Sequence, residues 1–337
     1  MHIHSLKPSA PWRLVLLGAF VALGVSLHIS LSSEVRATAV PNINLNNGVT
    51  MPMISAGLWQ VGRTETPPMI SAATKVGFTH IDGSCVGYSN EHELGDTLSK
   101  LDRDSFFLTT KLDPPWQYGW PADTAYKSAT AQLEGCLASH QVDYIDLLLY
   151  HYPPFGHMDG AKCHSVQETW RAMEALYHKG KVRALGVSNF CPSTFECLLK
   201  NATVKPAINQ VLYHVGMGPD PGGIKSYSDK LGVQLQAYSP LGAGTSGHPR
   251  TPELLTGDLV SKLARKYGKT GAQVSLRWVA QHGVAVATES TNPQHLRDDL
   301  AIFEFELSNS DMAELDAATA PAGTYSFACD CGDRCDD

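Results

Sequence analysis

Short apolar runs alternate with longer segments of helical periodicity along most of the chain. The segments 122–140 and 165–180 carry apolar residues at three- and four-residue intervals, with polar residues near their starts, which is typical of amphipathic helices. The intervening runs are short and rich in apolar and β-branched residues, which is typical of buried strands. Eight strands are predicted: ISAGL, FTHID, SFFLTT, IDLLLY, RALGVS, AINQV, VQLQAYS and VAVAT.

This alternation predicts the fold class. Eight strands that alternate with helices over about 280 residues have the count and size of a single (β/α)8 barrel. A doubly wound sheet is the alternative, but it would place a G-x-G-x-x-G turn after an early strand. The first strand is followed by WQVGRTETPP instead. We therefore predict an α/β protein with one (β/α)8 TIM barrel over residues 40–320.

The first 39 residues have the pattern of a targeting segment. Lys7 and Arg13 precede an apolar run from Leu14 to Leu27, which is shorter than the ~20 residues of a membrane-spanning helix. The pattern predicts a signal peptide, with an uncleaved membrane anchor over residues 14–31 as the alternative. The expected destination is the secretory pathway or the endoplasmic reticulum membrane, with a plastid reached through such a leader as the alternative.

The chain contains eight cysteines. Five are scattered through the predicted barrel without a short repeating framework, and we expect most of them to be free thiols: Cys85, Cys136, Cys163, Cys191 and Cys197. The other three lie in a Cys- and Asp-rich tail, residues 321–337, with a spacing that matches no common zinc site. No metal site is predicted, although a metal-binding secreted protein built around this tail is one alternative.

The charge pattern excludes one class of partner. The net charge is −7, and positive and negative residues are interspersed along the chain. Such a pattern offers no basic face for a phosphate backbone, so nucleic acid is not an expected partner.

Polar side chains close several of the predicted strands. They are Asp82, Lys111, His151, Ser188, Asn189, Gln210 and Tyr238. In a (β/α)8 barrel, the carboxyl ends of the strands form the mouth that carries the chemistry. Asp82 can hold Lys111 charged, a nearby ammonium group lowers the pKa of a tyrosine, and a neutral His151 can orient a carbonyl group. Proton transfer of this kind suits hydride transfer from a cofactor.

The chain resembles the aldo-keto reductase family from INLNNGVTMPMISAGLWQ to LSNSDMAELDA. The segment GKVRALGVSNF reproduces one family signature, and DLLLYHYP, PAINQV and LQAYSPLG follow in the family's order. The resemblance implies that Asp82, Tyr88, Lys111 and His151 are the catalytic tetrad, with Tyr88 as general acid. It also implies nicotinamide contacts and a loop around the cofactor pyrophosphate, made by Ser188, Asn189, Gln210, Tyr238, Ser239 and Leu241.

The segment before the tyrosine departs from the family. GSCVG places five residues between Asp82 and Tyr88, where the family usually has four. If the extra residue bulges out at Gly83 or Gly87, where positive φ costs little, Tyr88 still faces the lysine. If the register shifts instead, Gly87 takes the place of the tyrosine. We favour the bulge.

The cofactor segment departs as well. By the same resemblance, Glu289 stands at a usual lysine, His295 at an arginine and Asp299 at an asparagine that bind the adenosine 2'-phosphate and adenine, with Ser290 in the same segment. The family default is NADPH, but Glu289 and His295 favour NADH. Arg297 is the main objection, because it lies two residues past His295.

These observations predict an oxidoreductase that reduces a small aldehyde or ketone with NADPH or NADH. Trp59 and Trp116 are expected to line the substrate cleft. The alternative is a cofactor-binding regulatory or structural protein of the same fold without turnover.

Overall fold

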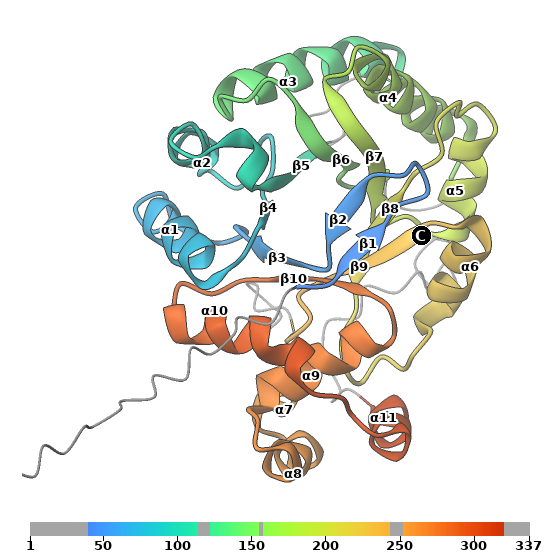
Figure 1. The fold of residues 1–337 in the computed structure, drawn as a ribbon. Helices are drawn as coiled ribbons and strands as arrows, with labels where there is room; N and C mark the ends of the chain where they lie inside the picture. Colours follow the sequence, from blue (N-terminus) through green and yellow to red (C-terminus); the bar gives the residue numbers. More distant parts are fainter. Residues whose placement is uncertain (1–39, 114–121, 155–157, 243–251, 320–337) are drawn as a thin grey trace, which may run out of the picture. The chain divides into compact units, whose positions relative to one another are not determined.

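Eight parallel strands close into a barrel in the computed structural model, which describes residues 40–113, 122–154, 158–242 and 252–319 (Figure 1). The strands follow one another around the ring in chain order, and the last one pairs with the first. The barrel strands are β3 (Ile54–Gly57), β4 (His80–Asp82), β5 (Phe107–Leu112), β6 (Ile145–Tyr150), β7 (Val182–Ser188), β8 (Ile208–Leu212), β9 (Gln234–Tyr238) and β10 (Ala285–Thr288). The predicted (β/α)8 barrel is therefore confirmed, and every predicted strand is present.

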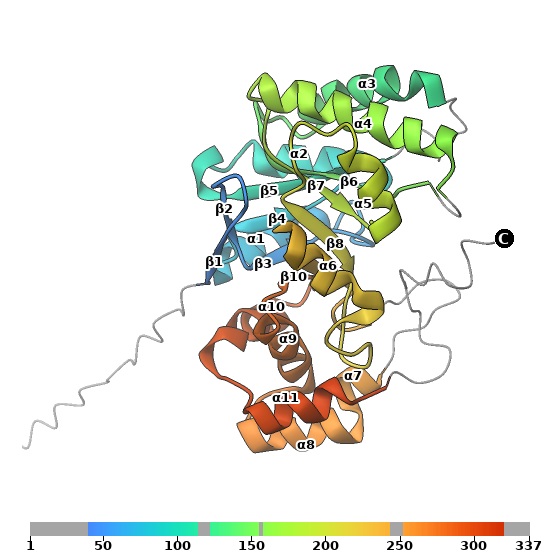
Figure 2. The ribbon, with the colours of Figure 1, turned by 90° about the vertical axis from the view of Figure 1, so that its right-hand side faces the viewer.

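Helices follow the strands and lie around the outside of the ring, as Figure 1 and the side view in Figure 2 show. The helices are α1 (Thr66–Val76), α2 (Glu91–Leu98), α3 (Ala125–Ser139), α4 (Gly160–His178), α5 (Pro192–Leu199), α6 (Ile224–Leu231), α7 (Glu253–Thr256), α8 (Asp258–Tyr267), α9 (Gly271–Gln281), α10 (Pro293–Leu300) and α11 (Asn309–Asp316). Their buried apolar faces pack against the barrel, which is why the helical segments are amphipathic.

Local capping signals explain where these helices begin and end. Helix α4 begins five residues before the predicted segment because the Asp159 carboxylate accepts a hydrogen bond of 2.8 Å from the Lys162 amide. Helix α1 has proline in its first turn and ends at Gly77, whose φ of 116° glycine adopts at little cost.

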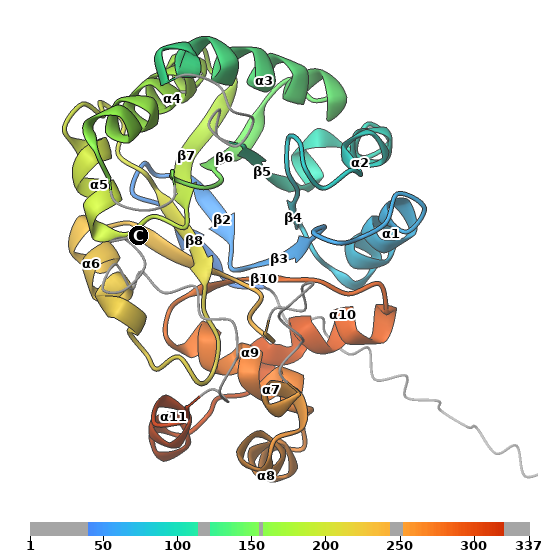
Figure 3. The ribbon, with the colours of Figure 1, turned by 180° about the vertical axis from the view of Figure 1, so that it is seen from behind.

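A two-stranded hairpin closes the amino-terminal end of the barrel. Strands β1 (Asn42–Asn44) and β2 (Thr50–Pro52) are antiparallel, and the buried side chains of Leu45 and Met51 pack with residues such as Phe107 and Ala285, which begin barrel strands. Figures 1 and 3 view the barrel from its two ends, with the hairpin in front of the strands in Figure 1. The carboxyl ends of the strands are thus left to form the site.

The expectation of free thiols is wrong. Cys85 is bonded to Cys136, and Cys163 is bonded to Cys197, across 51 and 34 residues of sequence; Cys191 is disulfide-bonded as well. The first bond joins the loop after β4 to α3, and the second joins α4 to α5. No short sequence framework marks these pairs because the barrel itself brings neighbouring βα units together.

Two predicted segments, the leader (residues 1–39) and the cysteine-rich tail (residues 321–337), lie outside the described residues, so they stay predictions. Within the part of the chain that the structure describes, no helix has the length and apolar character needed to cross a bilayer. The same residues contain no cluster of three or more histidine, cysteine or acidic side chains that could hold a metal ion.

Candidate functional site

A cavity of about 350 Å³ opens at the carboxyl ends of the strands. Its walls come from the strand ends and the loops that follow them, as expected for the mouth of a (β/α)8 barrel. It brings together most of the predicted site residues: Trp59, Asp82, Tyr88, Lys111, His151, Ser188, Asn189, Gln210, Tyr238, Ser239, Leu241 and Glu289. Trp59 is 37% exposed at the rim, whereas Trp116 lies outside the described residues.

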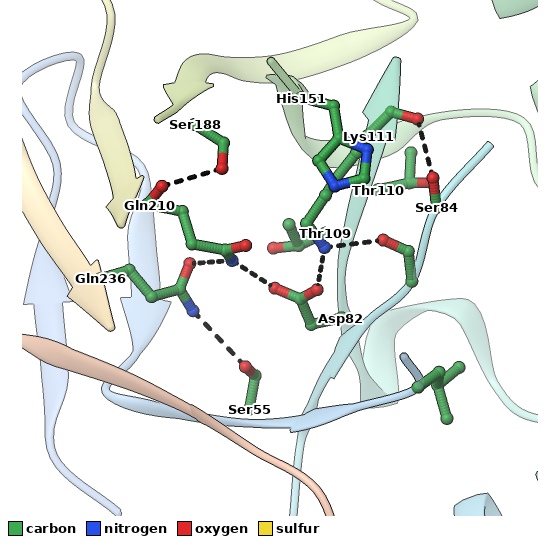
Figure 4. A network of polar contacts seen from close by, with 12 residues as sticks. Ser55, Asp82, Ser84, Thr109, Thr110, Lys111, His151, Ser188, Gln210 and Gln236 are labelled. Atoms are coloured by element: carbon green, nitrogen blue, oxygen red, sulfur yellow. Dashed lines mark hydrogen bonds and ion pairs between the residues drawn. The ribbon is translucent and has the colours of Figure 1, made fainter. Parts of the chain in front are cut away.

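Asp82 and Lys111 form a buried ion pair at the base of this cavity. Lys111 Nζ also donates to the Gly83 carbonyl oxygen at 2.9 Å, and the second carboxylate oxygen of Asp82 accepts from Gln210 Nε2 at 2.7 Å. Figure 4 shows Asp82 between Lys111 and Gln210. A buried ion pair is costly unless it is also hydrogen-bonded, and these contacts hold the ammonium group in place.

The hydrogen bonds continue from the mouth into the barrel interior. Gln210 Nε2 also donates to Gln236 Oε1 at 2.9 Å, and Gln236 Nε2 donates to Ser55 Oγ at 3.4 Å (Figure 4). All three side chains are buried. Since the Gln210 amide nitrogen has its partners within the protein, a cofactor amide at this position would be met by Gln210 Oε1.

The backbone immediately before Tyr88 turns at Gly87. This glycine has a φ of +96°, whereas Gly83 is not in the left-handed region. Tyr88 therefore faces the cavity, with its ring centroid 5.3 Å from Lys111 Nζ. The Glu91 carboxylate accepts from the amides of Tyr88 and Ser89 at 2.9 and 3.1 Å and fixes the loop to the start of α2. The alternative register, with Gly87 in place of the tyrosine, is not the one observed.

The electrostatics at Tyr88 differ from the prediction that Lys111 lowers its pKa. Desolvation, followed by the charges of Asp82, Asp113 and Glu289, holds the pKa of Tyr88 well above its usual range. The ammonium charge of Lys111 is already paired with Asp82. Tyr88 consequently keeps its proton at neutral pH and can donate it when negative charge develops on a neighbouring oxygen.

His151 is held from two sides. Its Nδ1 lies 2.5 Å from Asp113 Oδ1, and the Tyr152 ring stacks on it at a centroid distance of 4.2 Å. Burial is the main reason that the pKa of His151 is lowered, which favours the neutral ring. Sequence reasoning missed Asp113 and Tyr152. An acidic residue two positions after Lys111, at the end of β5, was the signal for the first.

Ser188, Asn189 and Tyr238 form one side of the cavity. Ser188 Oγ donates to the Gln210 carbonyl oxygen at 2.8 Å, and Asn189 Nδ2 donates to the His151 carbonyl oxygen at 3.0 Å. Tyr238 donates its hydroxyl hydrogen to Asn189 Oδ1 at 2.9 Å, which fixes the position of its ring. Asn189 has a φ of 63° and Ser239 one of 47°. Non-glycine residues in the left-handed region are often found at functional sites.

The segment after β10 is brought to the site only in part. Glu289 lines the cavity, but Ser290, His295 and Asp299 are not among its lining residues. His295 is exposed, with Nδ1 3.3 Å from Ser290 Oγ. Asp299 is buried and accepts a hydrogen bond of 2.9 Å from Thr288 Oγ1, and burial raises its pKa to about 7. The carboxyl group of Asp299 is thus turned toward Thr288, and its predicted contact with a cofactor stays a prediction.

Comparisons with known proteins agree with this geometry. The model of the aldo/keto reductase family matches residues 53–320. The glyoxal reductase of Bacillus subtilis is 36% identical over 278 residues, which cover 82% of this chain and 91% of that protein. The NADPH-dependent D-xylose reductase of Meyerozyma guilliermondii is 34% identical over 304 residues, covering 81% and 93% of the two chains. A crystal structure of a Bombyx mori aldo-keto reductase in complex with NADP matches with a TM-score of 0.69 and 26% identity, over 83% and 93%.

Proposed function

The chain belongs to the aldo/keto reductase family and is an oxidoreductase, and we propose that it reduces an aldehyde or ketone to an alcohol with a nicotinamide cofactor and with Tyr88 as proton donor. One observation carries this proposal. Tyr88, Lys111 and His151 line the same cavity although an extra residue precedes the tyrosine. A protonated hydroxyl, a paired ammonium group and an imidazole then surround the space that a carbonyl group would occupy.

The residues on the other side of the cavity fit the cofactor. The fixed ring of Tyr238 offers a flat apolar surface, and Ser188, Asn189 and Gln210 are polar groups within reach of an amide. When bound, the nicotinamide supplies the hydride. Tyr88 donates its proton to the substrate oxygen, and the ammonium group of Lys111, which Asp82 holds in place 5.3 Å from the ring centroid, faces the phenolate that is left. The proton transfer is completed when Tyr88 regains a proton from solvent.

We propose that NADH is used at least as well as NADPH. Glu289 lines the cavity at the position that the family resemblance assigns to a cation, and His295 is exposed and hydrogen-bonded to Ser290. Arg297 is also exposed, and its guanidinium group donates to Gln294 Oε1 at 2.8 and 3.1 Å. A carboxylate about 4 Å from a phosphate charge costs roughly 4 kcal/mol at an effective dielectric constant near 20. In contrast, the D-xylose reductase relative is named as NADPH-dependent, which favours NADPH.

The proposed substrates are small carbonyl compounds. Trp59 and Tyr152 supply apolar walls, and the cavity of about 350 Å³ must hold the reacting end of the cofactor as well as the substrate. The two relatives named above are called reductases of glyoxal and of D-xylose. A contribution from Trp116 stays a prediction.

We further propose that the chain acts in an oxidising compartment reached through its leader. The Cys85–Cys136 and Cys163–Cys197 disulfides support this proposal, because structural disulfides persist mainly outside the cytosol. Residues 1–45 fused to a fluorescent reporter are expected to direct it into the secretory route or, by the same route, into a plastid. A reporter that stays cytosolic contradicts the proposal.

Two measurements on the purified protein test the function. Oxidation of NADH and of NADPH is followed at 340 nm with glyoxal and with propanal, and cofactor binding is followed by the quenching of protein fluorescence. We expect turnover with at least one aldehyde. Binding of cofactor without turnover of any aldehyde or ketone would favour the alternative, a regulatory or structural protein that keeps only the cofactor site.

A further inference from the structure

A buried carboxylate lies behind the histidine of the site. Asp113 is 4% exposed, and its Oδ1 is 2.5 Å from His151 Nδ1. The two residues follow the adjacent strands β5 and β6, and the His151 amide donates to the Leu112 carbonyl oxygen at 2.9 Å. The barrel therefore sets the distance between the two side chains.

The backbone around Asp113 is fixed on its other sides. The Asp113 amide donates to Gln132 Oε1 of α3 at 2.8 Å. The loop before Tyr88 packs directly over the carboxylate, because a Cβ atom at Gly87 would lie only 2.9 Å from Asp113 Oδ2. Glycine at position 87 thus permits both the positive φ and the close contact between this loop and the carboxylate.

The contact decides which ring nitrogen of His151 carries hydrogen. A carboxylate only accepts hydrogen bonds, so the nitrogen that faces it must be the donor. In the neutral ring the other nitrogen, Nε2, is then an acceptor. The lowered pKa of His151 favours the neutral ring at pH 7, with Asp82, Asp113 and Lys111 as the charged groups that act on it.

We propose that Asp113 is a positioning residue that holds His151 with hydrogen on Nδ1, so that Nε2 offers an acceptor to the substrate and favours carbonyl compounds with a hydroxyl group on the neighbouring carbon. An acceptor cannot hold a carbonyl oxygen, which leaves that oxygen to the hydroxyl of Tyr88. Nε2 can, however, accept a hydrogen bond from a hydroxyl group on the carbon next to the carbonyl carbon. The substrate preference rests on the proposed function, whereas the state of the ring does not.

The state of the ring is measured first, by long-range ¹H–¹⁵N correlation spectra of the full chain at pH 7.5, with His151→Gln used to identify the signal. We expect the wild-type signal of a neutral ring with hydrogen on Nδ1. Hydrogen on Nε2 overturns the proposal. This measurement needs no turnover, so it separates a failure of the inference from a failure of the proposed function.

The preference is measured with two substrates of equal size, glycolaldehyde and propanal, which differ by a hydroxyl in place of a methyl group. We expect wild-type kcat/KM to be at least ~10-fold higher for glycolaldehyde, since a site that accepts a hydrogen bond discriminates against the analogue that lacks the donor. Asp113→Leu should remove most of this preference, so that the two kcat/KM values become similar. Asp113→Asn should retain it, because the amide oxygen still accepts from Nδ1.

A merely structural role for Asp113 would lower activity toward both aldehydes equally and leave their ratio unchanged. That result in Asp113→Leu overturns the proposal, as does loss of the ratio in Asp113→Asn. If Asp113→Leu does not fold, the asparagine variant and the wild-type spectrum still decide. Wild-type protein that reduces both aldehydes without preference contradicts the inference but supports the proposed function.

Discussion

Cys85, three residues before Tyr88, is bonded to Cys136 of α3. The loop that carries the proposed proton donor is therefore tied covalently to a neighbouring helix. The Cys85 amide also donates to the Lys111 carbonyl oxygen at 2.9 Å, so the same short segment contacts the strand end that carries the lysine. Local freedom in this loop would displace the hydroxyl of Tyr88 relative to the substrate.

Removing this disulfide should lower turnover. We expect the double variant Cys85→Ser, Cys136→Ser to lose ~10-fold or more in kcat, because a small misplacement of a reacting group is costly, while cofactor affinity changes little. The matched control is Cys163→Ser, Cys197→Ser, which removes the disulfide between α4 and α5. Either pair should cost about 2–4 kcal/mol of stability. Equal kcat losses in the two variants, measured at a temperature where both are folded, would contradict the prediction.

The catalytic set makes a second prediction. Tyr88→Phe removes the proton donor, and Lys111→Met removes the charge that stabilises the phenolate, so each should lower kcat by at least ~100-fold. Fluorescence titration should show cofactor binding largely intact in Tyr88→Phe. If the Tyr88→Phe variant turns over as fast as the wild-type protein, another group must deliver the proton.

Cofactor choice is expected to depend on the charge at position 289. Glu289→Lys should shift the ratio of kcat/KM values toward NADPH by ~10-fold or more, since a cation forms charge-assisted hydrogen bonds with the 2'-phosphate. Glu289→Gln, the control that removes the negative charge alone, should give a smaller shift in the same direction. Should wild-type protein bind NADPH far more tightly than NADH at physiological salt, Arg297 or another cation must meet the phosphate.

The raised pKa of Asp299 predicts how the stability of the fold depends on pH. Its folded-state pKa of about 7 lies above the ordinary value, so the folded protein disfavours the ionised form. Below pH ~4 the carboxyl group of Asp299 is neutral in both the folded and the unfolded protein, so it does not change the free energy of unfolding. As pH rises from about 4 to 7, folding loses stability, by an amount on the order of 4 kcal/mol, and the loss stays constant above pH 7.

Asp299→Asn should remove this dependence, because its amide oxygen can accept from Thr288 Oγ1 without ionising. Chemical unfolding at pH 4, 6 and 8 should show the variant more stable than wild type at pH 8, with a difference that shrinks toward pH 4. A difference independent of pH would mean that Asp299 does not titrate in this range.

The sequence alone determined the order of strands and helices and the polar residues at the strand ends. Each of these depends on local periodicity, and parallel strands in a closed barrel bring their carboxyl ends to one mouth. That is why the sequence assigns Asp82, Lys111 and His151, which are far apart along the chain, to one site. The sequence likewise indicated Gly83 or Gly87 as a place for positive φ, since glycine adopts it at little cost, and the structure has it at Gly87.

Only the tertiary structure decided which side chains touch. The Cys85–Cys136 bond, the contact of Asp113 with His151 and the turn of Asp299 toward Thr288 join residues through loop geometry and burial, which no periodic pattern specifies. Burial, followed by the charges of Asp82, Asp113 and Glu289, also reversed the expected direction of the Tyr88 pKa. Sequence spacing names the groups at the mouth, but distances of a few ångströms and the loss of water set their protonation.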